Sequence, residues 1–294
     1  MRFGGPIFSK EARTAKPGES HGVGAADPEW LVNEHRRKGY AAAYAPQLSL
    51  AQGDEIRAVR KAFADADIMI AEVGYWENLV DLDPDARRIN RQTMTDALAL
   101  AEELGARCAV DIFGSYCYGN GNSVHAARNF SEDAFAEAVD MARYFIDAVK
   151  PKTAFFAYEI FPFSVVDTPE QLERLIKSVD RAQFGVHMDL VNLVNCPRAY
   201  WDNAAIIRDC VKRFGDRIVA SHVKDIKMKE PAISVILEEV PAGQGIIDFG
   251  AYMRALCDLP RDIPFMLEHL ADEAEYDAAA AHIRNIAKGE GIAL

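Results

Sequence analysis

Residues 154–159, AFFAYE, form a short apolar run that ends on the carboxylate of Glu159. Similar runs recur along the chain, and longer segments with helical periodicity separate them. Such alternation is typical of β-α units around a parallel sheet, whose strands are buried on both faces and are therefore apolar almost throughout. The eight expected strands are 2–8, 41–44, 68–73, 108–113, 154–159, 184–189, 218–222 and 264–268.

The segments between these runs carry the start and stop signals of helices. Side chains that can cap a helix N-terminus precede four of them, namely Asp27, Asp83, Ser131 and Thr168. Glycines stand where three helices are expected to end, namely Gly39, Gly105 and Gly215. A stripe that would pack on the outside of the sheet follows Pro84, namely Met94, Ala97, Leu98, Ala101 and Leu104. Eight strand-helix units in 294 residues predict an α/β protein, a single (β/α)8 TIM barrel domain over residues 1–294.

Composition narrows the function classes. The formal net charge of −12 argues against a nucleic acid or an anionic membrane as partner, because Lys and Arg drive binding to phosphates. We therefore expect a small soluble substrate. The five cysteines form no C-x-x-C pair and are expected to be reduced. No segment has the roughly 20 apolar residues of a membrane helix, and residues 1–17 lack the apolar core of a signal peptide, so a cytoplasmic location is expected.

Four consecutive expected strands end on side chains that can bind a metal, namely Glu159, Asp189, His222 and Glu268. The carboxyl ends of barrel strands face one shared space, which is where the active sites of TIM barrels lie. Three carboxylates converging there would repel one another, and a divalent cation with an imidazole among its ligands removes that cost. We expect one divalent metal ion, manganese first, with magnesium or cobalt as alternatives to a closed zinc site.

Two residues at the barrel mouth are further candidates for substrate contact. Glu72 closes the third strand, and Trp76 follows it in a loop suited to stacking on a sugar. Plain packing is the alternative for both. His187 shares a strand face with Asp189 because side chains alternate with period two, so it should point into the barrel below the metal. It either supports a metal ligand, contacts the substrate, or is a buried structural histidine that bonds a neighbouring strand.

The loops after the sixth and seventh strands supply three more candidates. Asn192 and Arg198 could hold sugar hydroxyls or a carboxylate. Lys224 could balance an oxyanion or a phosphate, or pair with the adjacent Asp225. His269 directly follows Glu268 and is expected to face the helix layer, without a chemical role.

These features together resemble the sugar phosphate isomerase/epimerase superfamily of xylose isomerase-like barrels. The resemblance covers nearly the whole chain. It is carried by the four strand-end residues, by the run SHVKD at residues 221–225, and by AGQGIIDF at residues 242–249, which is similar to a G-x-G-x-x-D-F segment of that family. The resemblance implies a metal-dependent isomerase or epimerase in which Glu159 and Glu268 also act as acid and base beside a sugar carbonyl, while Asp189 and His222 hold the metal.

Departures from the epimerase pattern leave a second reaction open. Epimerases of the superfamily usually carry a histidine where Asn192 stands and an arginine where Met228 stands. The segment 189–200 is similar to the branch containing C-glycoside deglycosidase α subunits, which eliminate an aglycone from a 3-oxo glycoside and use a small second subunit. Some of that branch have a histidine base where Ala157 stands.

Two other classes remain as alternatives on the same barrel. Nucleases of the endonuclease IV type gather three metals with many more histidines than the seven of this chain, and its acidic charge also disfavours them. A sugar-binding barrel without activity is the other alternative. Members of the superfamily are often dimers or tetramers, so a homo-oligomer is expected.

Overall fold

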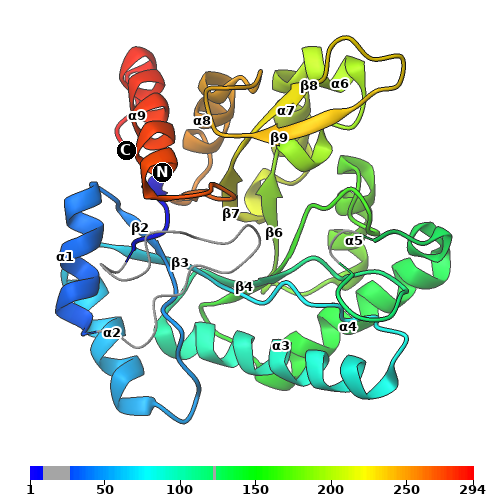
Figure 1. Cartoon of the computed structure of the whole chain (residues 1–294). Coiled ribbons are helices and arrows are strands. Elements are labelled where there is room, and N and C mark those ends of the chain that lie inside the picture. The colour runs from blue at the N-terminus through cyan, green and yellow to red at the C-terminus, as the bar shows by residue number, and fades with distance from the viewer. Residues whose placement is uncertain (9–26, 122–123) are drawn as a thin grey trace.

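Eight parallel strands close into a barrel in the computed structural model, which describes residues 1–8, 27–121 and 124–294 (Figure 1). The hydrogen-bonded order around the ring is β1-β10-β7-β6-β5-β4-β3-β2, and β2 pairs with β1 to complete it. The strands are β1 Arg2–Gly4, β2 Ala42–Tyr44, β3 Met69–Gly74, β4 Cys108–Asp111, β5 Phe155–Glu159, β6 Phe184–Asp189, β7 Ile218–Val223 and β10 Pro264–Leu267. The predicted (β/α)8 TIM barrel is therefore confirmed.

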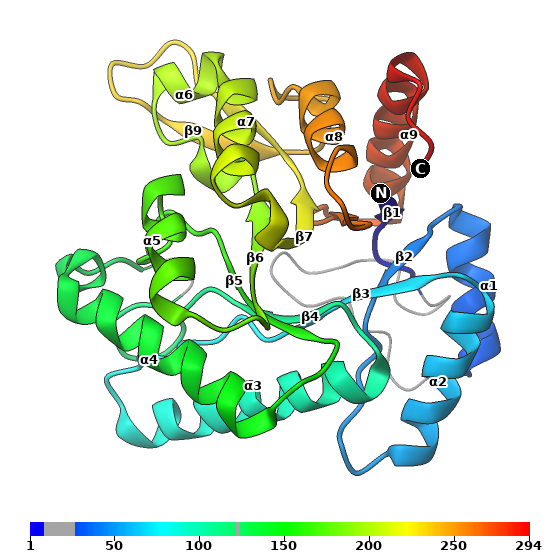
Figure 2. The same cartoon turned by 180° about the vertical axis from the view of Figure 1, so that it is seen from behind.

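Helices surround the barrel on its outside, as Figures 1 and 2 show from opposite sides. They are α1 Pro28–Lys38, α2 Gly53–Asp65, α3 Pro84–Leu104, α4 Glu132–Val149, α5 Pro169–Val179, α6 Pro197–Trp201, α7 Asn203–Phe214, α8 Phe249–Cys257 and α9 Glu273–Glu290. The four predicted N-cap side chains each accept a backbone N–H bond from the first turn. Gly39, Gly105 and Gly215 directly follow α1, α3 and α7, as predicted, although only the first two are left-handed.

β1 and β4 are shorter than predicted by more than one residue. β1 ends at Gly4 instead of residue 8, and Pro6 lies in the part that fails to pair. Proline has no N–H to give to a strand ladder, so the pairing stops before it. β4 ends at Asp111 because Phe113 has a positive φ of 73°, which is incompatible with an extended strand.

The core has an outer layer between the strands and the helices and an inner layer within the barrel. Aromatic rings dominate the outer layer, where Phe156 and Tyr158 of β5 pack against each other and against Phe184 of β6. The stripe predicted on α3 is buried there too. Inside the barrel lie smaller side chains, including Val110, Ala157 and Ala220. These leave room for the long polar side chains described below.

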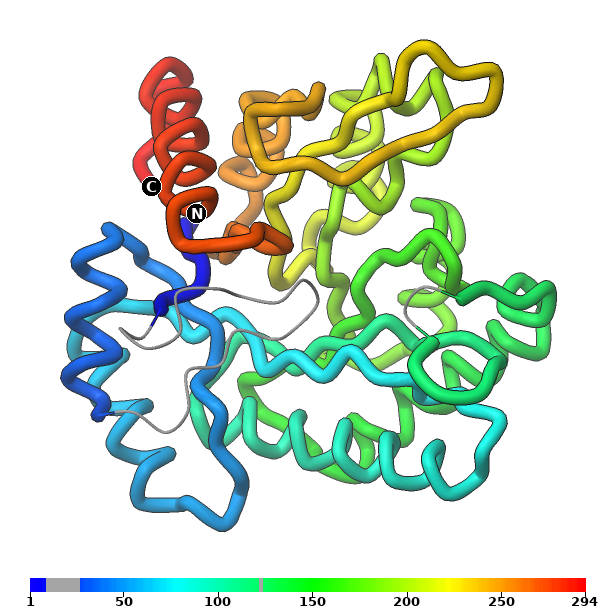
Figure 3. The backbone as a smooth tube through the Cα atoms, in the orientation of Figure 1, coloured from blue at the N-terminus to red at the C-terminus, as the bar shows by residue number. Residues whose placement is uncertain are grey.

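A two-stranded antiparallel hairpin, β8 (Asp225–Met228) and β9 (Leu237–Val240), is inserted between β7 and α8. Figure 3 shows this hairpin projecting beyond the ring. The sequence analysis did not anticipate it. The five cysteines are free thiols, as expected. No helix in the described part of the chain combines the length and apolar character needed to cross a bilayer.

Candidate metal centre

The four predicted ligands meet at the carboxyl end of the barrel. Glu159 closes β5, Asp189 closes β6, His222 lies near the end of β7, and Glu268 follows β10. Each offers one ligand atom, and these atoms all lie within 4.8 Å of one another. The four residues are between 1 % and 6 % exposed. The structure therefore assembles one compact, buried donor set from positions more than 100 residues apart in sequence.

The register of the parallel strands explains why these side chains converge. Asp189 is paired with His222 across β6 and β7, and His222 is paired with Met266 across β7 and β10. Side chains in equivalent register positions of a barrel point to the same layer of its interior. Glu268 lies two residues after Met266 and therefore returns to the inner face.

The four clustered side chains shift one another's pKa values, some upward and some downward. Burial, together with the neighbouring Glu268 and Glu159, raises the pKa of Asp189 to about 7 although Lys224 opposes the shift. Burial disfavours ionisation of Glu159 and Glu268 and is the largest single effect, but the charge and hydrogen bond of His222 and other nearby positive groups together outweigh it and lower the pKa of both. Burial would lower the pKa of His222, yet Glu268, Glu72 and Glu159 raise it well above its usual range. The carboxylates of the site therefore favour a positively charged group among them.

Lys224 extends into this group from just beyond β7. Its Nζ lies 2.8 Å from Asp189 Oδ2 and 2.9 Å from Glu268 Oε1, and 3.3 Å from Glu239 Oε2. The alternative pairing with Asp225 is absent among these contacts, because the Asp225 carboxylate accepts backbone N–H groups instead. Lys224 therefore contributes a buried positive charge beside two of the predicted ligands.

Two predicted substrate residues contact Glu159 instead of standing apart from it. The indole Nε1 of Trp76 donates to Glu159 Oε2 at 2.6 Å, and Asn192 Nδ2 lies 3.4 Å from Glu159 Oε1. Gly74 makes the first contact possible, because a Cβ there would lie only 2.1 Å from the Trp76 ring. Both side chains are partly exposed at the barrel mouth, so a role in substrate contact stays a prediction for each.

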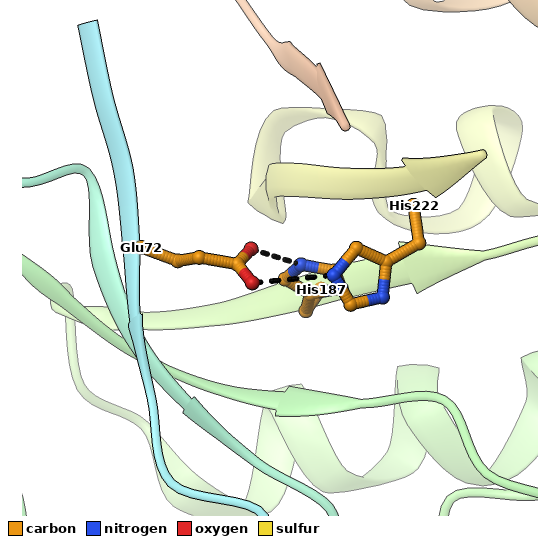
Figure 4. A group of neighbouring side chains, drawn as sticks. All are labelled: Glu72, His187 and His222. Carbon is orange, nitrogen blue, oxygen red and sulfur yellow. Dashed lines mark hydrogen bonds and ion pairs between the residues drawn. The ribbon is translucent and has the colours of Figure 1, made fainter. Parts of the chain in front are cut away.

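His187 points into the barrel below the centre, as predicted, and Glu72, which was expected at the barrel mouth, is buried beside it. Their side chains are 0 % exposed, and Glu72 Oε2 lies 2.6 Å from His187 Nε2 (Figure 4). Glu72 Oε1 is 3.2 Å from His222 Nε2. Arg198 lies on the short helix α6 with an exposed side chain. The structure thus places Glu72 and His187 under the centre and Arg198 on the exposed surface of α6.

His269 was predicted to face the helix layer, and that prediction is wrong. Its Nε2 lies 3.5 Å from Glu268 Oε2, and its Nδ1 lies 2.7 Å from Glu239 Oε1. The physical reason is that β10 has already ended at Leu267 and His269 has a positive φ of 57°, so strand alternation no longer applies. Glu239 was missed because it belongs to the inserted hairpin. The strands of this hairpin lack the continuous apolar run from which the barrel strands were predicted.

The motif segments after β7 build a rigid loop beside the centre. Asp225 is buried and accepts four backbone N–H bonds, from Ile226, Gly243, Gly245 and Ile247, at 2.9–3.0 Å. A Cβ at Gly245 would lie 2.3 Å from Asp225 Oδ1, which explains the glycine there. Asp248 caps α8 by accepting from the N–H of Ala251 at 2.8 Å. The aspartates and glycines of these segments therefore serve the loop and not the metal.

The donor set fits a divalent cation. Four buried carboxylates, those of Glu72, Glu159, Asp189 and Glu268, lie in or directly below this cluster, and the ammonium of Lys224 contacts two of them. A dication would offset most of the remaining negative charge. Three carboxylates with one imidazole nitrogen form the kind of mixed oxygen and nitrogen set that manganese and magnesium accept.

A family model described as "Xylose isomerase-like TIM barrel" matches residues 35–286. The chain belongs to this family. The match includes all four clustered ligands and the loop that Asp225 holds. Membership in the sugar phosphate isomerase/epimerase superfamily, expected from the sequence motifs, is therefore confirmed.

Individual relatives are distant. A probable L-ribulose-5-phosphate 3-epimerase, UlaE of Mycoplasma pneumoniae, is 23 % identical over 192 residues, which are 65 % of this chain and 55 % of that protein. The chain thus matches about half the length of this curated relative. D-psicose 3-epimerase from Clostridium cellulolyticum, solved with D-tagatose, is similar in structure over 100 % of both chains, with a TM-score of 0.68 and 15 % identity.

Endonuclease IV from Thermus thermophilus has nearly the same structural similarity, with a TM-score of 0.67, 16 % identity, and coverage of 98 % of this chain and 100 % of that one. A sugar epimerase and a nuclease therefore share this barrel about equally well. The fold alone does not select the reaction, and the side chains of the site must do so.

Proposed function

We propose that this protein is a divalent-metal-dependent sugar epimerase or isomerase that removes a proton from the carbon next to a carbonyl. The observation that carries the proposal is the position of two glutamates. In ring order the ligand strands are β5, β6, β7 and β10, so Glu159 and Glu268 stand at the two ends of the row and flank Asp189 and His222. Two carboxylates on opposite sides of one site can reach opposite faces of a single carbon.

The chain's own residues divide the work. Glu159 is held at Oε2 by the Trp76 indole, and Glu268 is held at Oε1 by Lys224. The lowered pKa of each keeps it ionised and able to act as a base. One carboxylate takes the proton as the C–H bond breaks and an O–H bond forms, and the electron pair moves toward the carbonyl oxygen. The opposite carboxylate, which has taken a proton from solvent, gives it to the other face as the electron pair returns from the oxygen to the carbon. The carbon is inverted, and the first carboxylate releases the proton it took to solvent.

A divalent ion bound by the four ligands would polarise the carbonyl and so favour loss of the adjacent proton. Manganese is the ion we propose, with magnesium or cobalt as alternatives, since all three accept this donor set. A compact sugar or polyol derivative fits the charge of the protein better than a nucleic acid, because phosphate backbones are bound through lysine and arginine surfaces.

The test is incubation of the manganese-loaded protein in D₂O with a panel of ketoses and, separately, with a 3-oxo glycoside. We expect deuterium at the carbon next to the carbonyl together with the epimeric or isomeric sugar, detected by NMR and mass spectrometry. Glu268→Gln should abolish both while the protein stays folded. Release of an aglycone without epimer formation would instead establish elimination, and metal binding without any proton exchange would overturn the enzyme assignment.

A further inference from the structure

Below the proposed metal centre, three polar side chains cross the barrel interior. Glu72 comes from β3, His187 from β6 and His222 from β7, and Figure 4 shows the Glu72 carboxylate directed at both imidazoles. The distances are 2.6 Å from Glu72 Oε2 to His187 Nε2 and 3.2 Å from Glu72 Oε1 to His222 Nε2. The two rings lie 4.1 Å apart between centroids, at 62°. One carboxylate therefore joins two strands on the far side of the barrel.

This cluster has no access to solvent. The three side chains are 0–1 % exposed, and Val110, Ala157 and Ala220 lie in the same barrel interior. Burying a charged carboxylate among such groups is costly unless it is hydrogen-bonded. His187 and His222 supply its bonds.

Irregular strand pairing accompanies the cluster on both sides of the barrel. The register shifts between Ala43 and Tyr44, where β2 meets Glu72, and again between Val186 and His187, where β6 meets β7. Such bulges redirect side chains and are common next to active sites. They place Glu72 and His187 at the layer of the His222 ring.

The hydrogen bonds assign a direction to His222. A carboxylate oxygen accepts, so Nε2 of His222 is assigned the hydrogen and donates it to Glu72 Oε1. A histidine binds a metal ion as the neutral ring, and its lone pair is then on Nδ1. Nδ1 is the atom that faces the ligands, 2.9 Å from Glu268 Oε2 and 3.3 Å from Glu159 Oε1.

Resting on the metal site of the proposed function, we propose that Glu72 is a positioning residue for His222. It fixes the tautomer and the orientation in which Nδ1 offers its lone pair to a metal ion. His187 occupies the second oxygen of Glu72 and thereby holds the carboxylate in place. A hydrogen-bonded carboxylate behind a metal-binding histidine raises the strength of that ligand, and its loss typically weakens metal binding about 10- to 100-fold.

The test is manganese binding to the metal-stripped full-length protein, measured by calorimetry for the wild type and for Glu72→Gln. Glutamine keeps the shape, but its amide can donate to Nε2, which permits the wrong tautomer. We expect one site per chain in both proteins and a dissociation constant about 10- to 100-fold higher in the variant. Asp111→Asn is the matched control, because Asp111 is an equally buried carboxylate at the end of β4, where its Oδ1 accepts from the N–H of Ile112. It should bind manganese like the wild type.

A spectroscopic measurement keeps the proposal testable if Glu72→Gln does not fold. In the zinc-loaded wild-type protein labelled with ¹⁵N-histidine, His222 should show a hydrogen on Nε2 and metal coordination at Nδ1. The opposite tautomer would overturn the proposal, as would unchanged affinity in Glu72→Gln. Two ions in the wild type and one in the variant, with equal affinity for the ion that remains, would instead make Glu72, His187 and His222 a second metal site. Wild-type protein that binds manganese but exchanges no sugar proton would refute the proposed function and leave this inference standing.

Discussion

The two halves of the barrel end their strands differently. Of the four candidate ligands, Glu159 and Asp189 end β5 and β6, His222 is next to last in β7, and Glu268 follows β10. By contrast, β1, β2, β3 and β4 end on Gly4, Tyr44, Gly74 and Asp111. Tyr44 and Trp76 lie 6.4 Å and 6.0 Å from the His222 ring between centroids. The first half thus supplies aromatic walls and one carboxylate from below, and the second half supplies the donor atoms. The candidate metal centre is therefore built mainly by one half of the barrel, although all eight strands are arranged alike around the ring.

The sharpest way to break this contrast is to remove one strand-end acid from each half. Glu159→Gln should lower the rate of solvent-deuterium exchange into the sugar about 10³-fold, because a general base is lost. Asp111→Asn should change that rate less than about 3-fold, since the Asp111 carboxylate bonds its own strand end through the N–H of Ile112 and does not reach a ligand. Equal losses in the two variants would contradict the division between the halves.

A smaller effect on the exchange rate should follow from Trp76→Phe. This variant tests the hydrogen bond that Trp76 of the first half donates to Glu159 of the second half. The variant retains an aromatic ring but loses the N–H that Glu159 Oε2 accepts at 2.6 Å. A hydrogen bond to a charged group is worth about 1.5–3 kcal/mol, so exchange should slow about 10- to 100-fold. The measurement is the same isotope exchange, with circular dichroism to verify folding. Tyr75→Phe, an adjacent change on the same loop, serves as the control and should leave the rate close to that of the wild type.

We call the contact between α3 and the residues just before β5 the seam between the two halves. It lies away from the site, and the smallest expected effect concerns it. Glu102 of α3 accepts N–H bonds from Thr153 and Ala154, at 2.9 and 2.8 Å, just before β5. These bonds outweigh burial and lower the pKa of Glu102. Its contribution to the free energy of unfolding is therefore present above the ordinary carboxyl pKa and is lost as the pH falls through the lowered one.

Urea unfolding between pH 7 and pH 3 tests this seam. Glu102→Gln should be less stable than the wild type at pH 7, and the difference should shrink at the acidic end. Exposed Glu103 gives a control, since Glu103→Gln should follow the wild-type profile. Manganese affinity at pH 7 should be the same in all three proteins, and a loss of affinity in Glu102→Gln would show that the seam is coupled to the centre.

Sequence patterns predicted the second half of the barrel well. β6 begins and ends where predicted, and the four ligands cluster as expected, because each closes an apolar run whose register is fixed by burial on both faces. The predictions fail for residues that lie beyond the regular, buried part of a strand. β1 was extended through Pro6, and His269 was assigned to the wrong face because a left-handed residue follows the strand end.

Other features carry no local signal at all. The bond between Glu72 and His187 joins residues 115 apart, and no periodicity within β3 or β6 announces it. Glu239 reaches Lys224 from a hairpin whose strands are half polar and only partly buried. Such contacts depend on which strands face each other across the barrel, and this is settled only when the ring closes.

The backbone hydrogen bonds that Asp225 accepts affect how this protein can change over evolution. Because one carboxylate fastens Gly243, Gly245 and Ile247, the hairpin re-enters the barrel at a fixed point. The hairpin tip, with Ile233 fully exposed, lies outside that clamp. Its length and chemistry can therefore be exchanged as a cassette without disturbing His222 or Glu268. Changes at the hairpin tip and the geometry of the candidate metal centre are therefore separable in this barrel.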